Sequence, residues 1–553
     1  MPATVEKKVP FKLRPLKYAF VFGLLVLLPL SVVILSWLQV DTELWRHLLE
    51  HQLGFLTLQT VSLAVGTLIW TGFLGVSLAA LVAFTEFPGR RFLSWALLLP
   101  FALPAYVQAF VWVDLLDYSG LVPTFLRQSF GLDLVSWPSV RSLPGAWWAL
   151  SLSFFIYVYL LTLGAFYSQG RRSLEVARSL GYSPWQGFWR VSLPLAKPWV
   201  GAGLLLVLME VLSDYGTVAL LGVDSLTVGI FRVWYGHFSL STAAQLASLL
   251  TLVVFAIVVL ESRLRQRQRF YEQKASGLAG SGAQFRSTRG LRLAAMIFSW
   301  TVFALAFVLP MGRLLWLGAS VQDYHYAWAS VFPVLLNTLV LGGLAAVLTA
   351  LAAFFMVADL RLRGGGLRSS ALRLGALGYA LPGAVLAVGV FTPLVLLDKQ
   401  IHSLLSGWFE GGGGLLLTGT LWAMLLGYFI RFLAIPLLSL GSASQNLPGR
   451  MDEAARSLGE AEGGLVRRLY WPLLKKGLLI SLPLVVVDVM KEMPMTLMMR
   501  PTGWDTLSVR IFQLTSEGLW AEAAWPAVIL SLSAVVPIYF FLRPLTRVGL
   551  RYG

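Results

Sequence analysis

The chain reads EVARSLG at residues 175–181 and, after nine further residues, VSLP at residues 191–194. The same pattern returns later in the chain as EAARSLG at 453–459, followed after nine residues by LYWP at 469–472. The glutamates, the glycines and the prolines of the two copies all keep one spacing, that from Glu175 to Glu453. Each copy predicts a short helix, a turn at the glycine and a second helix stopped near the proline. Two polar segments in an otherwise apolar chain predict a soluble partner with two equivalent binding sites.

The composition indicates a membrane protein. Of the 553 residues, 57% are hydrophobic and 13% are charged, whereas a soluble domain is about half apolar and about a quarter charged. Apolar runs of about 20 residues, the length of a helix that crosses the hydrocarbon core, recur along the chain. We therefore expect an all-α polytopic membrane protein rather than the short alternating segments of a transmembrane barrel.

The net charge of +16 follows from basic residues in alternate short loops between apolar runs. The positive-inside rule accounts for that distribution, so no nucleic-acid partner is expected. The chain has no cysteine, which excludes disulfides, thiolate metal sites and thiol catalysis. A basic cluster precedes the first apolar run and no small-residue cleavage site follows it, so we expect an uncleaved first span with a cytoplasmic N-terminus.

Twelve spans are predicted, an even number that returns the C-terminus to the cytoplasm. They cover about 18–38, 54–84, 92–116, 146–168, 199–221, 241–261, 293–318, 333–358, 371–397, 415–440, 477–499 and 521–542. The third span contains Pro100 and Pro104, which predict a kinked or interrupted helix. Residues 40–52 carry apolar side chains at helical spacing among charges and are expected to lie in the outer interface.

We expect the chain to divide into two halves, residues 1–262 and 292–553, joined by a basic cytoplasmic linker at 263–291. The linker is rich in arginine and, near its middle, in glycine and serine, which predicts a flexible connection; a lipid-binding or regulatory role is the alternative. Gln59-Thr60 matches Asn337-Thr338, and Leu103-Pro104 matches Leu381-Pro382, at the same spacing as the two motif copies. Six spans per half give both halves the same orientation, so we expect a parallel repeat with one path between the halves.

The repeated motif resembles the coupling motif of the membrane subunits of binding-protein-dependent ABC importers, whose type I permease fold the two halves are expected to share. In that family the loop docks in a groove of the ATP-hydrolysing subunit, and here the coupling loops would span about 170–198 and 441–477. The residues that match the motif are Glu175, Ala177, Gly181, Pro194, Glu453, Ala454, Ala455, Gly459 and Pro472. The second copy departs from the pattern with Trp471 before its proline, and the first with Val176.

The resemblance implies an inner-membrane transport subunit that works with two copies of a cytoplasmic ATP-binding subunit and with a periplasmic substrate-binding protein. The sequence contains no phosphate-binding loop of the Gly-x-x-x-x-Gly-Lys-Ser/Thr type. We therefore expect no enzymatic activity and no catalytic residue in this chain, no covalently bound cofactor, and ATP bound on the partner. The glycine run 411–414 lacks the lysine and is interpreted as a flexible external turn.

Fused permeases of this type resemble two groups, those for ferric iron and those for thiamine. The stretches that begin at Asp214-Tyr215-Gly216-Thr217 and at Lys491-Glu492-Met493-Pro494 resemble the ferric-iron permeases, so Fe(III) is the expected cargo. Thiamine or another small organic cation is the alternative, which an aromatic-lined cavity would favour. An ion-coupled secondary transporter is a third hypothesis, but it leaves the paired cytoplasmic motif unexplained.

The residues themselves indicate a cation pathway. Four acids lie in apolar surroundings at matching positions of spans five and eleven: Glu210, Asp214, Asp488 and Glu492. Each pair is spaced i, i+4, which predicts one helix face, and intramembrane acids cost about 2.5–3.5 kcal/mol each on insertion scales and normally face a path or a partner. Carboxylates suit a trivalent cation as transient ligands, and Tyr215 adds a phenol. Alternatively Lys491 or Arg500 neutralises the second pair, and the first pair caps or bridges helices.

Two further groups of possible metal ligands have simpler interpretations. Five methionines near span eleven could line a copper(I) path, but the first half has no comparable cluster, so packing is the preferred interpretation: Met490, Met493, Met495, Met498 and Met499. His47 and His51 share a helix face, where an interfacial position is preferred over a zinc site.

Overall fold

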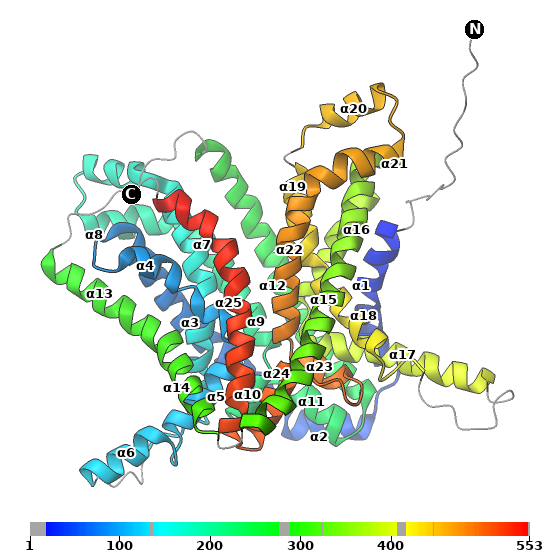
Figure 1. Ribbon diagram of the computed structural model, residues 1–553, viewed down its shortest axis with the longest axis horizontal. Helices are drawn as coiled ribbons and strands as arrows, with labels where there is room; N and C mark the ends of the chain where they lie inside the picture. Colours follow the sequence, from blue (N-terminus) through cyan, green and yellow to red (C-terminus); the bar gives the residue numbers. More distant parts are fainter. Residues whose placement is uncertain are drawn as a thin grey trace.

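The computed structural model describes residues 18–131, 137–275, 288–321, 324–405, 416–445 and 447–550. Every regular element in these ranges is helical, which confirms the all-α polytopic fold (Figure 1). Nine helices of the described chain are long and apolar enough to cross a membrane, or ten if the bent pair at 421–432 and 434–445 forms one span. Each of the twelve expected spans coincides with helix, and the number of membrane crossings stays a prediction.

The long helices follow the repeat. Those of the first half are α1 (Tyr18–Leu35), α3 (Leu53–Phe84), α4 (Arg90–Ala96), α5 (Ala105–Leu116), α7 (Leu143–Ser179), α9 (Leu193–Ser213) and α12 (Leu240–Ala275). Those of the second half are α13 (Arg289–Phe303), α14 (Leu309–Ala319), α15 (Tyr324–Arg363), α16 (Gly366–Leu377), α17 (Gly383–Leu405), α18 (Leu421–Phe432), α19 (Ala434–Gln445), α22 (Trp471–Lys491) and α25 (Trp520–Leu550). The expected interfacial segment forms the short helix α2 (Thr42–His51), whose first turn donates to the Asp41 side chain.

Shorter helices connect the long ones on both sides. They are α6 (Leu121–Phe130), α8 (Pro184–Gly187), α10 (Gly216–Leu220), α11 (Leu226–Gly236), α20 (Gly449–Ser457), α21 (Glu462–Gly464), α23 (Pro494–Met499) and α24 (Leu507–Ser516). The pairing across the repeat extends to their contacts. The Thr60 hydroxyl accepts from the Leu226 N–H at 2.9 Å, and the Thr338 hydroxyl accepts from the Leu507 N–H at 2.9 Å.

The third span of each half is broken at a Leu-Pro pair. In the first half a 3₁₀ turn at Leu99–Ala102 separates α4 from α5, so the interruption expected near Pro104 is confirmed. The second half breaks in the same way at Gly378–Ala380, between α16 and α17, within the span expected at 371–397. Proline disfavours helical geometry at the residue before it, and Leu103 and Leu381 are accordingly extended, with ψ of 117° and 130°.

The expected linker at 263–291 is helical over its first part, because α12 continues to Ala275. Residues 276–287 and the N-terminal basic cluster lie outside the described residues, as does the glycine run 411–414. The proposed division into two halves at this linker therefore stays a prediction of the sequence.

The two hydrophobic cores do not follow the two halves of the sequence. Val26 and Val33 of α1 lie in a core formed mainly by second-half residues such as Leu386 and Tyr428. Conversely, Ala306 and Leu314, from the region of α13 and α14, lie in a core formed mainly by first-half residues. The first helix of each half thus packs into the opposite half, which ties the halves together.

Candidate functional site

A cavity of about 140 Å³ lies where the C-terminal ends of α9 and α22 meet the two broken helices. All four predicted pathway acids and Tyr215 line it. The two halves touch at its edge, since a Cβ placed on Gly216 would lie 2.5 Å from Cε of Met493. The tertiary structure therefore brings the acids of the two repeats to one place between the halves.

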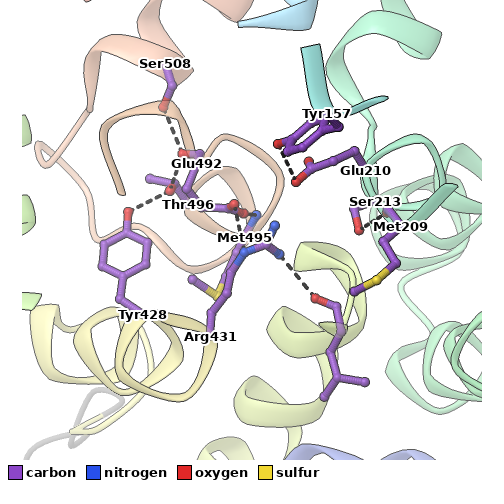
Figure 2. Close-up of polar contacts among 11 residues, drawn as sticks. Tyr157, Met209, Glu210, Ser213, Tyr428, Arg431, Glu492, Met495, Thr496 and Ser508 are labelled. Carbon is purple, nitrogen blue, oxygen red and sulfur yellow. Dashed lines mark hydrogen bonds and ion pairs between the residues drawn. The ribbon is translucent and has the colours of Figure 1, made fainter. Parts of the chain in front are cut away.

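Glu210 and Asp488 occupy equivalent positions in α9 and α22, and both are half-buried. The Tyr157 hydroxyl donates to Glu210 Oε1 at 3.1 Å (Figure 2). Tyr379 lines the cavity together with Asp488 in the second half. Neither carboxylate has an ion pair at 4.0 Å or less among the described residues. These two acids are the pathway candidates whose charge is least compensated by direct contact.

Asp214 has a structural role at the end of α9. Its two carboxylate oxygens accept from the Thr217 N–H at 3.0 Å, the Val218 N–H at 3.2 Å and the Thr217 hydroxyl at 2.9 Å. These groups belong to the first turn of α10, whose N–H groups have no partners within the helix. The expectation that Glu210 and Asp214 share a face of one continuous helix is wrong, because α9 ends at Ser213 and Asp214 is extended.

Glu492 is 5% exposed and is held from several directions. Its carboxylate forms an ion pair with Arg431, with 3.2 Å between Oε2 and Nε, and accepts from the Met495 N–H at 3.0 Å (Figure 2). Its carbonyl oxygen accepts from the hydroxyls of Thr496 and Ser508 at 2.8 and 2.9 Å. Since α22 ends at Lys491, Glu492 does not continue the helix face of Asp488 either.

The neutralising partner differs from the two that the sequence suggested. Arg500 pairs with Asp505, and the Lys491 ammonium donates to the Phe101 carbonyl at 2.5 Å. Lys491 Nζ also lies 4.2 Å from the centroid of the Phe101 ring. It remains close enough to Asp488 and Glu210 for electrostatic interaction. The cavity therefore contains four acids and two cations, and both cations come from the second half.

The broken helices contribute carbonyl groups that these cations satisfy. Lys491 binds the carbonyl of Phe101 at the first break, and Arg431 Nη1 donates to the carbonyl of Leu381 at the second break at 3.4 Å. Irregular backbone at membrane depth requires such partners, because lipid offers none.

The remaining metal hypotheses have little structural support. No three histidine, aspartate or glutamate side chains within the described ranges are grouped as a metal ion would need. Tyr215 stacks on Phe231, with 3.7 Å between ring centroids. The five methionines named above are all buried in the hydrophobic cores, as packing residues would be. His47 and His51 stack on each other at 5.0 Å between ring centroids.

Sequence reasoning missed Arg431, Tyr157 and Tyr379. A signal existed for Arg431, because an arginine within a predicted span is itself a mark of a partner or a path. The two tyrosines carry no such signal in a chain with 17 tyrosines. Their carboxylate partners could be found only by folding the chain.

The two copies of the repeated motif fold alike. Each glycine has a positive φ, +75° at Gly181 and +83° at Gly459. The N–H of the residue after each glycine donates to the carbonyl of Ala177 or of Ala455, at 3.0 and 3.2 Å. This hydrogen bond is typical of a helix that ends at a left-handed glycine, so the predicted helix and turn are present in both copies.

The sequence suggested that the helix after each turn stops near the proline. In the structure the helix continues past the proline in both copies. A π-helical turn precedes the proline in both copies, at Phe188–Ser192 and Leu465–Tyr470. Pro194 and Pro472 then lie in the first turns of α9 and α22, which continue toward the cavity. Proline fits this position because its missing N–H is not needed in a first turn. Each loop is therefore joined directly to the helix that carries the cavity acids.

Both loops lie toward the same end of the molecule, at α8 and α20 in the upper part of Figure 1. They present apolar side chains, with Leu180 63% exposed and its repeat equivalent Leu458 84% exposed. Glu453, Ala454 and Gly459 are exposed, whereas Ala177 is buried. Glu175 lies in α7, and its side chain is outside the described residues.

Comparison with known proteins agrees with this geometry. Residues 71–269 match the family described as the binding-protein-dependent transport system inner membrane component. The Fe(3+)-transport system permease protein FbpB 2 of Haemophilus influenzae is 28% identical over 547 residues, which cover 98% of this chain and 99% of that protein. The sulfate transport system permease protein CysT of Escherichia coli is 25% identical over 254 residues, 44% of this chain and 90% of its own length.

The helical fold, the two motif copies at one end and the cavity between the halves are the features of a multi-pass membrane protein, and the relatives that it matches are transport permeases. Residues 71–269 are thus similar to the inner membrane components of binding-protein-dependent transport systems, and nearly the whole chain is similar to one such permease. A relative of similar length is matched along almost all of this chain, whereas CysT, about half as long, matches less than half of it.

Proposed function

We propose that the chain is the membrane subunit of an ATP-driven importer that moves ferric iron across the inner membrane. The observation that carries the proposal is the similarity to the Fe(3+)-transport permease FbpB 2, which extends over 98% of this chain and therefore over both repeats. The acidic cavity between the halves supports it, because hard carboxylate oxygens suit a small trivalent cation.

The cargo would pass between α9 and α22. Glu210 and Asp488 lower the energy of the cation in the membrane, since neither is neutralised by a direct ion pair among the described residues. Asp214, Tyr215 and Glu492 form part of the wall around them. Asp214 accepts hydrogen bonds from the first turn of α10, and Glu492 is neutralised by Arg431.

Two copies of a cytoplasmic ATP-binding subunit would grip the two coupling loops. The loops share one fold and one end of the molecule, and each is continuous with a helix of the cavity, which supports this assignment. Glu175, Ala177, Gly181 and Pro194 in one loop, with their counterparts in the other, would form the two contact sites. This places both termini in the cytoplasm and a periplasmic binding protein at the opposite face.

A small organic cation such as thiamine has some support from the cavity, because Phe101, Phe154 and Tyr157 line it. The Phe101 ring is already covered by the Lys491 ammonium, however, which leaves less aromatic surface for a second cation. A secondary transporter would instead work without any ATP-binding partner.

Transport of labelled ferric iron into proteoliposomes tests the proposal. The full complex should take up iron only with ATP and binding protein present, and excess thiamine should not compete. Replacing Glu175 and Glu453 by Ala should reduce uptake strongly, whereas Ser457→Ala, a neighbouring exposed position, should not. Uptake without ATP, uptake of thiamine instead of iron, or full activity of the double variant would each contradict part of the proposal.

A further inference from the structure

We infer that two phenol–carboxylate pairs, Tyr157 with Glu210 and Tyr379 with Asp488, form a transient oxygen-ligand site for the ferric ion in the cavity. The inference rests on the proposed function and adds the ligand set to it. It also changes the expected set, because Asp214 and Glu492 are occupied by other partners.

The repeat explains the acids but not the tyrosines. Glu210 and Asp488 are equivalent positions, separated by the same spacing as Glu175 and Glu453. The equivalent of Tyr157 is Ile435, and the equivalent of Tyr379 is Phe101. Tyr157 comes from α7, whereas Tyr379 comes from the break before α17. Each half therefore places a phenol in the cavity with its carboxylate, but from a different element, which duplication alone would not produce and a shared chemical requirement would.

The chemistry of the pairs fits a hard trivalent cation. In the resting state the Tyr157 hydroxyl donates to Glu210, and the Tyr379 phenol lines the same cavity as Asp488. When the metal binds, the phenolic proton is released to water, and phenolate and carboxylate oxygens become ligands; metal binding generally releases protons from its ligands in this way. The iron stays ferric throughout. The ammonium of Lys491, held at the Phe101 carbonyl, limits the net negative charge when the site is empty of cargo.

The hydroxyl group of a third tyrosine also lies in this cavity. Tyr106 lines the cavity and is 6% exposed, and its hydroxyl has no hydrogen-bond partner among the described residues. It lies near enough to Glu492 and Asp214 to interact with them electrostatically. A buried hydroxyl without a partner is costly, so its position at the cavity wall favours a ligand that would complete it.

The test uses the purified complex of the permease with its ATP-binding subunits, without binding protein, and ferric nitrilotriacetate as the probe. Phenolate ligation of Fe(III) gives a ligand-to-metal charge-transfer band in the visible spectrum, which carboxylates alone do not give. We expect the band in the unaltered complex, a loss of about half in Tyr157→Phe or Tyr379→Phe, and its disappearance in the double variant. Tyr428→Phe is the matched control, because the Tyr428 hydroxyl is bound to Thr496 at 2.6 Å in the core.

Uptake of labelled iron by proteoliposomes of the same variants, with ATP and binding protein added, separates the two proposals. Iron uptake without any charge-transfer band in the unaltered complex would overturn the phenol ligands and leave the proposed function intact. A band that survives in the double variant would also overturn them. Absence of ATP-dependent iron uptake would instead overturn the proposed function. ATP hydrolysis by each variant verifies that it has folded. If Tyr157→Phe does not assemble, Glu210→Gln should weaken the band instead, because it changes the other ligand of the same pair.

Discussion

The two halves of the cavity carry the same acids in different surroundings. Where the second half has Arg431 and Lys491, the equivalent positions of the first half are Ser153 and Ser213. The first half consequently satisfies Asp214 with N–H and hydroxyl groups, whereas the second satisfies Glu492 with a buried ion pair. The repeat thus places the carboxylates at equivalent positions, and residues that differ between the halves determine how their charge is balanced.

The coupling loops differ between the halves in a similar way. The first is anchored by ring contacts among Phe84, Phe166 and Phe188, with centroids 4.9–6.3 Å apart. The second is anchored by ion pairs at α15, including Arg361 with Asp452 at 3.0 Å and Arg363 with Glu462 at 2.9 Å. The two turns have the same geometry, but apolar packing holds the first loop and ion pairs hold the second. Added salt should therefore destabilise the second loop more than the first.

The largest expected effect is a loss of stability when the buried ion pair of the second half is removed. Arg431→Met leaves Glu492 buried without its cation, which should cost about 3–5 kcal/mol of unfolding free energy. Ser153→Ala at the equivalent position should cost about 1 kcal/mol or less. Thermal unfolding of the purified proteins compares the two. Equal stability of both variants would show that Glu492 does not depend on Arg431, and the double variant with Glu492→Gln should recover part of the loss.

Glu210→Gln and Asp488→Asn test whether the two halves contribute equally to transport. Each removes a charge that no ion pair in the described chain compensates, so iron uptake should fall at least about tenfold, the factor for about 1.4 kcal/mol. The unfolding temperature should change little. Initial uptake rates in proteoliposomes measure the effect, and a loss in one variant alone would mean that the path runs closer to one half.

The glycine turns should respond equally in both loops. An alanine at Gly181 or Gly459 meets no atom within 4 Å but must adopt a positive φ. The left-handed conformation costs about 1–2 kcal/mol per residue, which should loosen the turn and reduce transport per ATP hydrolysed. Gly463→Ala is the control, since Gly463 lies in α21 with similar open space and no positive φ. Different effects at the two turns would show that the loops are not equivalent.

The smallest effect is expected at Asp214. Asparagine keeps a side-chain oxygen for the first turn of α10, so Asp214→Asn should change stability by less than about 0.5 kcal/mol and leave transport near its original rate. Asp214→Ala removes the acceptor and should cost about 1 kcal/mol. A strong transport defect in the asparagine variant with unchanged stability would show that the charge of Asp214 contributes to the cation path.

Particular residues show which parts of the site could be predicted from the sequence. It located all four acids at the cavity and Gly181 and Gly459 at turns, because spacing and the repeat are visible along the chain. It placed Asp214 on the helix face of Glu210, which is wrong because α9 ends at Ser213, whereas the alternative that an acid of this pair caps a helix is confirmed for Asp214. It gave Glu492 the wrong partners, because Arg431 is distant in the sequence and reaches it only when α18 packs beside α22.

Membrane placement, the duplication and the coupling motif were determined by the sequence alone, since hydropathy and spacing are local properties of the chain. The exchange of first helices between the halves, the pairing of phenols with carboxylates and the balance of charge in the cavity were decided by the tertiary structure. These features depend on which side chains meet across long sequence separations, such as Tyr157 and Glu210, 53 residues apart. Packing of whole helices, rather than any pattern within one helix, selects such neighbours.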